Sequence, residues 1–140
     1  MEPKEFLKMA LRYERSADEV ERRTSIGRAY YAAFNHVRQV IEACGGVVDN
    51  AGAHGCVLYY LRSTANKGLP QNKNTHMTLS NLKTSRERAD YEMRADVPVQ
   101  ESELAVRQAR TVIEQISAVP EQVLRNAIRV IPRFPNTRQN

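Results

Sequence analysis

Cysteine is scarce in this sequence. Only Cys44 and Cys56 occur among the 140 residues, and they flank a glycine-rich stretch. No Cys-x-x-Cys pair or other zinc-ligand spacing is present, so the pattern of a metal site is missing. We therefore expect two reduced thiols, as is usual for an intracellular chain, with no metal ion and no cofactor.

Long apolar runs are also missing. No stretch approaches the ~20 apolar residues that span a bilayer. The opening residues, Met1 to Leu7, are charged and lack the apolar region of a signal peptide. These two absences predict no membrane contact and a cytoplasmic location.

Neither strand-like alternation nor an internal repeat is found. Apolar residues instead recur at intervals of three and four, which is the spacing of one helix face. The pattern predicts helices over 3–14, 17–43, 54–66, 75–93 and 101–118, followed by a short one after Pro120. Ser16, with Glu19 three residues later, is the expected N-terminal cap of the second helix. We expect an all-α, up-and-down bundle of four to five helices over 1–118, with a short C-terminal extra helix and basic tail over 119–140.

The net charge is moderately basic, at +5 with a calculated pI of 9.5. This excess suits an acidic partner such as RNA, but a solvated basic face produces the same number.

Residues 24–41 organise the predicted bundle, because this helix has two distinct faces. One face is apolar and is formed by Ile26, Tyr30, Ala33, Phe34, Val37, Val40 and Ile41. The other runs at the same spacing and contains Ser25, Arg28, Ala32, Asn35 and Gln39, with His36 at its margin. Such a helix packs on its own core with one face, and the other is left for another chain, a ligand or a buried polar network.

Three segments together resemble the HEPN superfamily of small helical proteins. Residues 25–34 are similar to its Ser-x-x-Arg-Ala-Tyr-Tyr-Ala-x-Phe helix, 54–57 to its His-x-Gly-Val helix start, and 82–91 to its Leu-x-x-x-Arg-x-x-Ala-Asp-Tyr signature. The resemblance covers about residues 3–118. It implies a helical bundle that pairs as a homodimer in a toxin–antitoxin or antiviral defence module. It also implies a nucleotidyltransferase or a larger defence effector as partner.

Ribonucleases of that superfamily carry Arg-x4-6-His and cleave RNA without a metal. Here seven residues separate Arg28 from His36, and eight helical steps place the two roughly 80° apart. Asn35 lies almost beneath Arg28 instead. The candidate catalytic residues are Arg28, which would stabilise charge on the scissile phosphate, and either His36 or His54, which would transfer the proton. The alternatives are an ion pair for Arg28, with Asp90 as a candidate partner, and packed or capping roles for the histidines.

A second group of polar residues is expected to be structural. Arg86 interrupts an apolar stripe, and Asp90, four residues later, is its nearest candidate ion-pair partner. Tyr31 and Tyr91 are predicted to join the same polar network or to lie in the core or a dimer interface. Arg86 and Asn35 are also candidates for contacting RNA or a partner protein.

The end of the chain is basic. Arg125, Arg129 and Arg133 are spaced by four and are predicted to line one face of the last helix, with Arg138 beyond it. An arginine stripe suits an RNA backbone, but equally an acidic protein surface or solvent.

Two functions follow from these observations. The first is a HEPN-type component of a defence or toxin–antitoxin module that acts on RNA, with metal-independent ribonuclease activity as its enzymatic form. The second is a non-catalytic HEPN dimer that serves as the partner of a nucleotidyltransferase or a larger effector. The missing Arg-x4-6-His spacing favours the second.

Overall fold

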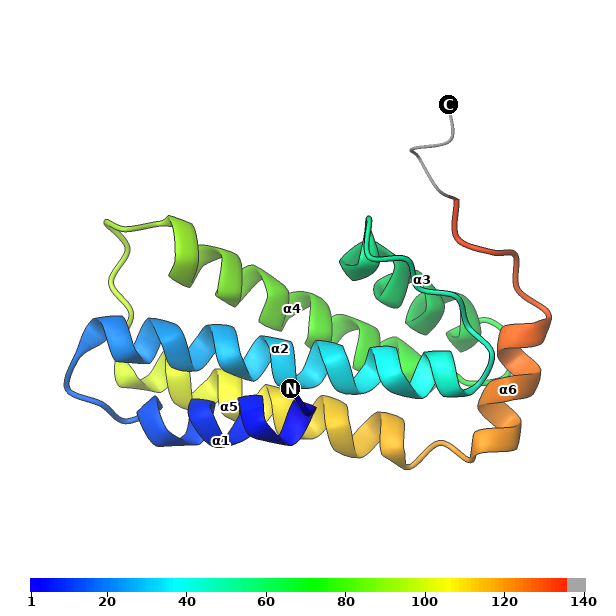
Figure 1. The fold of residues 1–140 in the computed structure, drawn as a ribbon, viewed down its shortest axis with the longest axis horizontal. Helices are drawn as coiled ribbons and strands as arrows, with labels where there is room; N and C mark the ends of the chain where they lie inside the picture. Colours follow the sequence, from blue (N-terminus) through cyan, green and yellow to red (C-terminus); the bar gives the residue numbers. More distant parts are fainter. Residues whose placement is uncertain (136–140) are drawn as a thin grey trace.

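The computed structural model describes residues 1–135, and this part of the chain contains α-helices and no β-strand. The helices are α1 (Pro3–Tyr13), α2 (Glu19–Ala43), α3 (Ala53–Ala65), α4 (Asn72–Tyr91), α5 (Val99–Ser117) and α6 (Glu121–Arg129), as shown in Figure 1. The prediction of an all-α bundle is confirmed. The expected bounds differ from the observed ones by a few residues at each end, where apolar spacing carries little information.

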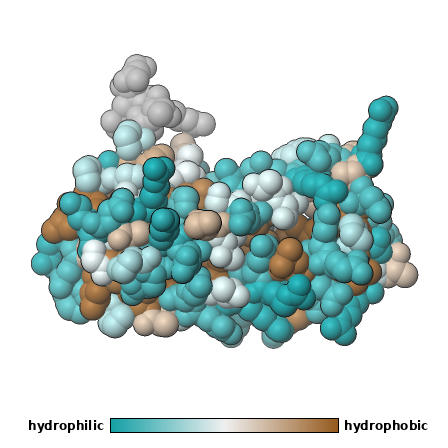
Figure 2. Space-filling model, turned by 180° about the vertical axis from the view of Figure 1, so that it is seen from behind, coloured by the Kyte–Doolittle hydropathy of each residue, from teal (hydrophilic) through white to brown (hydrophobic). Residues whose placement is uncertain are grey.

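The helices α1, α2, α4 and α5 form the bundle and run alternately in opposite directions (Figure 1). The central helix is α2, which packs against α1, α3, α4 and α5. The short helix α3 lies over the C-terminal half of α2 and the N-terminal half of α4. At that end of the bundle α6 packs against α3. The face opposite that of Figure 1 is mostly hydrophilic, with apolar residues in separate patches (Figure 2).

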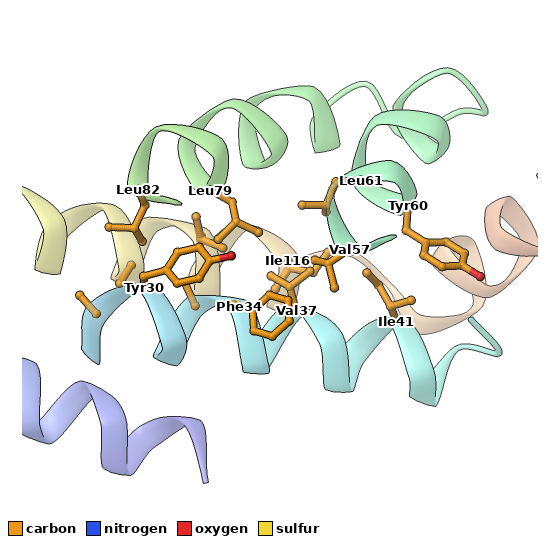
Figure 3. Packing of buried hydrophobic residues seen from close by; sticks show 14 of the residues in the cluster. Tyr30, Phe34, Val37, Ile41, Val57, Tyr60, Leu61, Leu79, Leu82 and Ile116 are labelled. Atoms are coloured by element: carbon orange, nitrogen blue, oxygen red, sulfur yellow. The ribbon is translucent and has the colours of Figure 1, made fainter. Parts of the chain in front are cut away.

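The core forms where the apolar faces of α2, α3, α4 and α5 meet. Figure 3 shows this packing for residues that are at most 4% exposed: Tyr30, Phe34, Val37, Ile41, Val57, Tyr60, Leu61, Leu79, Leu82 and Ile116. Burying each such side chain stabilises the fold by roughly 1.5–3 kcal/mol. The predicted apolar face of 24–41 is therefore the central surface of the core.

The start of α2 is capped differently from the expectation. Asp18, not Ser16, is the N-terminal cap, and its carboxylate accepts a hydrogen bond from the backbone N–H of Val20 at 2.9 Å. Ser16 instead donates to Glu21 at 2.7 Å. Both residues are good caps, and the choice falls to Asp18 because it directly precedes the first helical residue. At the other end, Gly45 adopts φ +96°, the left-handed conformation that ends the helix.

Arginines of α2 hold the connection between α4 and α5. The Arg22 guanidinium donates to the carbonyl of Val97 at 2.9 Å, and Arg23 donates to the carbonyl of Ala89 at 2.7 Å. Arg23 also donates to the carbonyl of Ala95, in the turn that follows α4. Val97 is fully buried, so the short extended linker is pinned against α2. Unpaired carbonyls at the end of α4 are satisfied in this way.

The last helix belongs to the same core as the rest of the bundle. Leu124, Ala127 and Ile128 of α6 are buried among the other core residues. The helix ends at Arg129 with Val130 as its C-terminal cap, so it stops short of the end of the predicted apolar stripe. Arg133 therefore lies beyond the helix. Arg138 and the rest of the predicted tail, residues 136–140, lie outside the described residues.

The described part of the chain has no helix that is both long and apolar enough to cross a membrane. Cys44 and Cys56 are both buried and free.

Candidate functional site

The three segments that carry the sequence resemblance meet at one place on the bundle. Arg28 and Tyr31 lie on α2, His54 lies in the first turn of α3, and Arg86 lies towards the end of α4. We call these four residues the Tyr31 site. The ring of Tyr31 is 6.1 Å from the ring of His54 and 5.5 Å from the Arg86 guanidinium carbon. All four side chains are partly exposed, so a ligand can reach them.

The floor of the Tyr31 site is a hydrogen-bonded pair formed by the buried Tyr30 and the partly exposed His54. The Tyr30 hydroxyl lies 2.5 Å from Nδ1 of His54, and Tyr30 is only 1% exposed. The imidazole also stacks on Phe34, with ring centroids 4.4 Å apart. Figure 3 shows Tyr30 and Phe34 projecting from α2 into the core. The His54 ring is thus held in one orientation from two sides.

Burial and nearby charge favour the neutral form of His54. Desolvation is the main cause of its lowered pKa, and the positive charges of Arg86 and Lys83 lower the pKa further. Burial also raises the pKa of Tyr30 well above its ordinary value, so its hydroxyl stays protonated. When this hydroxyl donates to Nδ1, the neutral imidazole carries its proton on Nε2. Nε2 has no hydrogen-bond partner within residues 1–135 and is the nitrogen left for a ligand.

Arg86 is a largely buried cation of the Tyr31 site. Its guanidinium carbon lies 5.3 Å from the ring centre of Tyr30, and its side chain is only 12% exposed. Nη1 lies 3.3 Å from the carboxylate of Asp90, which confirms the predicted ion pair. Its buried Nε has no hydrogen-bond partner within residues 1–135. Burying a polar group without a partner costs free energy, so stability alone does not account for this arginine.

Arg28 lies on the α1 side of the Tyr31 site. Its guanidinium carbon is 5.7 Å from the ring centre of Phe6, whose ring lies 6.2 Å from that of Tyr31. The ion pair suggested between Arg28 and Asp90 is not formed, because Asp90 pairs with Arg86. Arg28 makes no ion pair within the described residues. Its charge therefore remains available at the surface.

His36 lies elsewhere. Its Nε2 is 2.9 Å from the hydroxyl of Ser117 on α5, and burial lowers its pKa. It does not contact Arg28, which faces α1, so the structure does not bring these two candidate catalytic residues together. Asn35 is partly exposed and makes no side-chain hydrogen bond within residues 1–135.

Tyr91 is not part of the polar network or the core. It is 73% exposed and is the last residue of α4. Asp90 already turns away from the core at this end of the helix, and the next residue points into solvent. The prediction that Tyr91 joins the polar network or the core is wrong, and its place in a dimer interface stays a prediction. Tyr31 packs against other rings as expected.

The three arginines near the C-terminus converge, although not along one helix. Arg125 and Arg129 lie on α6 and Arg133 follows it, yet all three line one cavity of about 370 Å³ beside the end of α2. The chain bends after Val130 and directs Arg133 back to the side on which Arg125 and Arg129 lie. The prediction that the three arginines line one face of the last helix is therefore correct for Arg125 and Arg129 only, and Arg133 joins them through the bend in the chain.

One contact of the Tyr31 site and the arginine contacts at the linker between α4 and α5 could not be found from the sequence. The contact between Tyr30 and His54 joins residues 24 positions apart, and no periodicity relates them. The carbonyl contacts of Arg22 and Arg23 also depend on where the linker folds back. The only sequence feature that relates to these contacts is the dipeptide Arg22-Arg23 near the start of α2, and such a dipeptide is equally typical of a solvated surface.

Residues 1–135 contain no group of three or more side chains suited to holding a metal ion. The fold and the site define a helical bundle with a surface of arginine, histidine and aromatic side chains. Comparisons of the chain with protein-family models, with curated proteins and with solved structures find no match.

Proposed function

We propose that this protein is a HEPN-type helical module that binds single-stranded RNA at the Tyr31 site. The observation that carries the proposal is the meeting of Arg28, Tyr31, His54 and Arg86 at one surface. These residues come from the three segments that resemble the superfamily. A toxin–antitoxin or defence module, in which a homodimer of this chain works with a nucleotidyltransferase or larger effector, is the setting that the resemblance implies.

The chemistry of the Tyr31 site suits unpaired RNA. Single-stranded RNA is bound by stacking bases on aromatic rings or guanidinium planes, with cations along the backbone. Tyr31 and Phe6 supply partly exposed rings, and Arg28 and Arg86 supply the charge. His54 adds a hydrogen-bond donor at Nε2 when Tyr30 donates to Nδ1. This tautomer favours binding over base catalysis, because a general base needs an unprotonated nitrogen facing the substrate.

A fluorescence anisotropy titration tests RNA binding, using a labelled single-stranded RNA with hydroxyl groups at both ends. We expect Arg28→Ala and Tyr31→Leu to weaken binding about tenfold each, since a stacked base contributes roughly 1–3 kcal/mol. Arg110→Ala, an exposed arginine on α5, and Tyr91→Leu are the matched controls and should bind like the wild type. Equal losses in the controls, or no binding by the wild type, would refute the proposal.

Metal-independent cleavage of the bound RNA is a second candidate function. One observation favours it: the neutral form of His54 is favoured, and the ring lies near Arg86, whose charge contributes to lowering the histidine pKa. Proton transfer would use the tautomer in which Nδ1–H donates to Tyr30 and Nε2 is bare. Nε2 of His54 would take the proton of a ribose 2′-hydroxyl as its oxygen attacks the adjacent phosphorus, with Arg28 or Arg86 at the phosphate oxygens. The bond from phosphorus to the 5′-oxygen would break and that oxygen would take a proton from water, which gives a 2′,3′-cyclic phosphate and a 5′-hydroxyl.

A denaturing gel of end-labelled RNA in EDTA separates the two functions. If the protein is a ribonuclease, cleavage survives EDTA, disappears in His54→Ala and persists in His36→Ala. Loss of cleavage only in His36→Ala would instead assign proton transfer to His36, beside α5. If the RNA stays intact although the wild-type protein binds it, the result supports the non-catalytic binding module and contradicts the ribonuclease.

A further inference from the structure

We infer that the cavity between the end of α2 and α6 is a second binding site, for the phosphate monoester of a nucleotide. We call it the arginine pocket. Its cationic wall is Arg125, Arg129 and Arg133, and its volume of about 370 Å³ falls within the roughly 300–1,000 Å³ of small-molecule sites. In Figure 1, α6 and the segment after it flank the C-terminal end of α2. The pocket is separate from the Tyr31 site, and the inference does not rest on the RNA-binding proposal.

Arg125 is held in place, and all three arginines have donors to spare. Nη2 of Arg125 donates to the carbonyl of Ala43 at 2.8 Å and to Glu121 at 2.9 Å, which leaves most of its five N–H groups unused. Nη2 of Arg133 is 3.7 Å from Asp49, too far for a hydrogen bond. Arg129 makes neither an ion pair nor a hydrogen bond within residues 1–135. Guanidinium groups bind phosphate oxygens through paired N–H donors.

The backbone N–H groups of residues 45–47, beside the arginine pocket, already donate hydrogen bonds within the protein. The N–H groups of Gly45 and Gly46 donate to carbonyls of α2 at 3.1 and 2.9 Å. The N–H of Val47 donates to the Tyr60 hydroxyl at 3.0 Å. These groups are therefore not free to form a phosphate-binding loop. Recognition of an anion falls to the arginine side chains.

The apolar lining residues and the local charge of the arginine pocket indicate which kind of anion it binds. Val47, Tyr60, Ile128 and Ile131 give the pocket an apolar side, which suits the base or ribose of a nucleotide. Asp49 and Glu121 lie beside the arginines, so three positive charges and two negative ones leave a local charge of +1. That small excess fits one phosphate group and disfavours a polyphosphate. The ligand is a nucleoside monophosphate, either free or at the 5′ end of an RNA strand.

Isothermal titration with uridine 5′-monophosphate and with uridine tests the inference. We expect the nucleotide to bind at least about tenfold more tightly than the nucleoside, because hydrogen bonds to a charged group are the strong ones. Arg129→Ala should weaken nucleotide binding about tenfold, and Arg110→Ala should leave it unchanged. Asp49→Asn should tighten it, because the substitution removes a negative charge beside Arg133.

Competition with RNA identifies the source of the phosphate. Displacement of the nucleotide by an RNA with a 5′-phosphate, but not by the same RNA with a 5′-hydroxyl, assigns the pocket to strand ends. Failure of both RNAs to displace it assigns the pocket to the free nucleotide. Equal affinity for nucleotide and nucleoside, no binding of either, or equal losses in Arg129→Ala and Arg110→Ala would overturn the inference. The anisotropy experiment uses RNA without a terminal phosphate, so either proposal can fail alone.

Discussion

Replacing Arg86 by methionine should separate stability from function at the Tyr31 site. Methionine keeps an unbranched apolar stem and a similar helix propensity, but removes the charge and the buried Nε. We expect the Arg86→Met protein to fold with almost unchanged stability while its affinity for RNA falls. The reason is that the contacts made by this guanidinium nearly balance the cost of burying it.

The magnitude follows from the surroundings of the guanidinium. Its position over Tyr30 and Tyr31 contributes about 0.5–2 kcal/mol. The ion pair with Asp90 contributes about 0.3–0.5 kcal/mol, because Asp90 is 40% exposed and screened by solvent. Against these, the buried unpartnered Nε costs roughly 1–3 kcal/mol. The net change in the free energy of unfolding should therefore lie within about 2 kcal/mol of zero. Arg86→Ala should cost about 1–2 kcal/mol more, since it also removes the packed methylene groups.

Urea unfolding followed by circular dichroism measures both stability changes, and the slope of the transition shows whether the unfolded state has altered. An NMR titration of His54 provides a second readout. Its pKa should rise in Arg86→Met, because a positive charge that opposes protonation is removed, yet stay below its ordinary value because the ring remains partly buried. Arg110→Met is the matched control for both measurements.

A loss of more than about 3 kcal/mol in Arg86→Met would refute this reasoning, because it would make the arginine a structural requirement of the bundle. An unchanged His54 pKa would refute the electrostatic part separately. A variant that folds normally but binds RNA like the wild type would place Arg86 outside the binding surface.

Three further predictions concern pH, the core and one glycine. All three histidines have lowered pKa values in the folded protein, so the unfolded chain binds more protons than the folded one. The free energy of unfolding should therefore fall as the pH drops below about 6.5. Urea transitions that coincide at pH 7.5 and pH 5.5 would contradict this prediction. Leu82→Ala should cost about 2–5 kcal/mol because Leu82 is fully buried, whereas Leu104→Ala, at a side chain 45% exposed, should cost far less in the same assay. Gly27→Ala should raise the melting temperature, because alanine stabilises a helix interior by roughly 0.5–1 kcal/mol relative to glycine. The added methyl group would lie 3.9 Å from Asp90, which is an ordinary contact. A lower melting temperature would mean that α2 and α4 cannot accommodate the methyl group.

The helices and the identity of the central one were predictable from the sequence. Spacing of apolar residues within a helix is a local property, so the stripe from Ile26 to Ile41 indicated both the helix and its buried face. The pairing of Arg86 with Asp90 was predictable for the same reason, since residues four apart are neighbours on a helix surface. Helix ends were less certain, because Ser16 and Asp18 are both good caps and only the path of the chain selects between them.

The tertiary structure decided which distant residues meet. His54 comes to lie on Tyr30 and Phe34 because α3 packs back over α2, and the sequence interval between them carries no sign of that contact. Likewise Arg133 joins the arginine pocket although α6 ends at Arg129, because the chain turns after the helix. Periodicity determines which face of each helix is apolar, since it depends on neighbours along the chain. The polar groups that share a surface depend on how whole helices pack, and that is settled only in three dimensions.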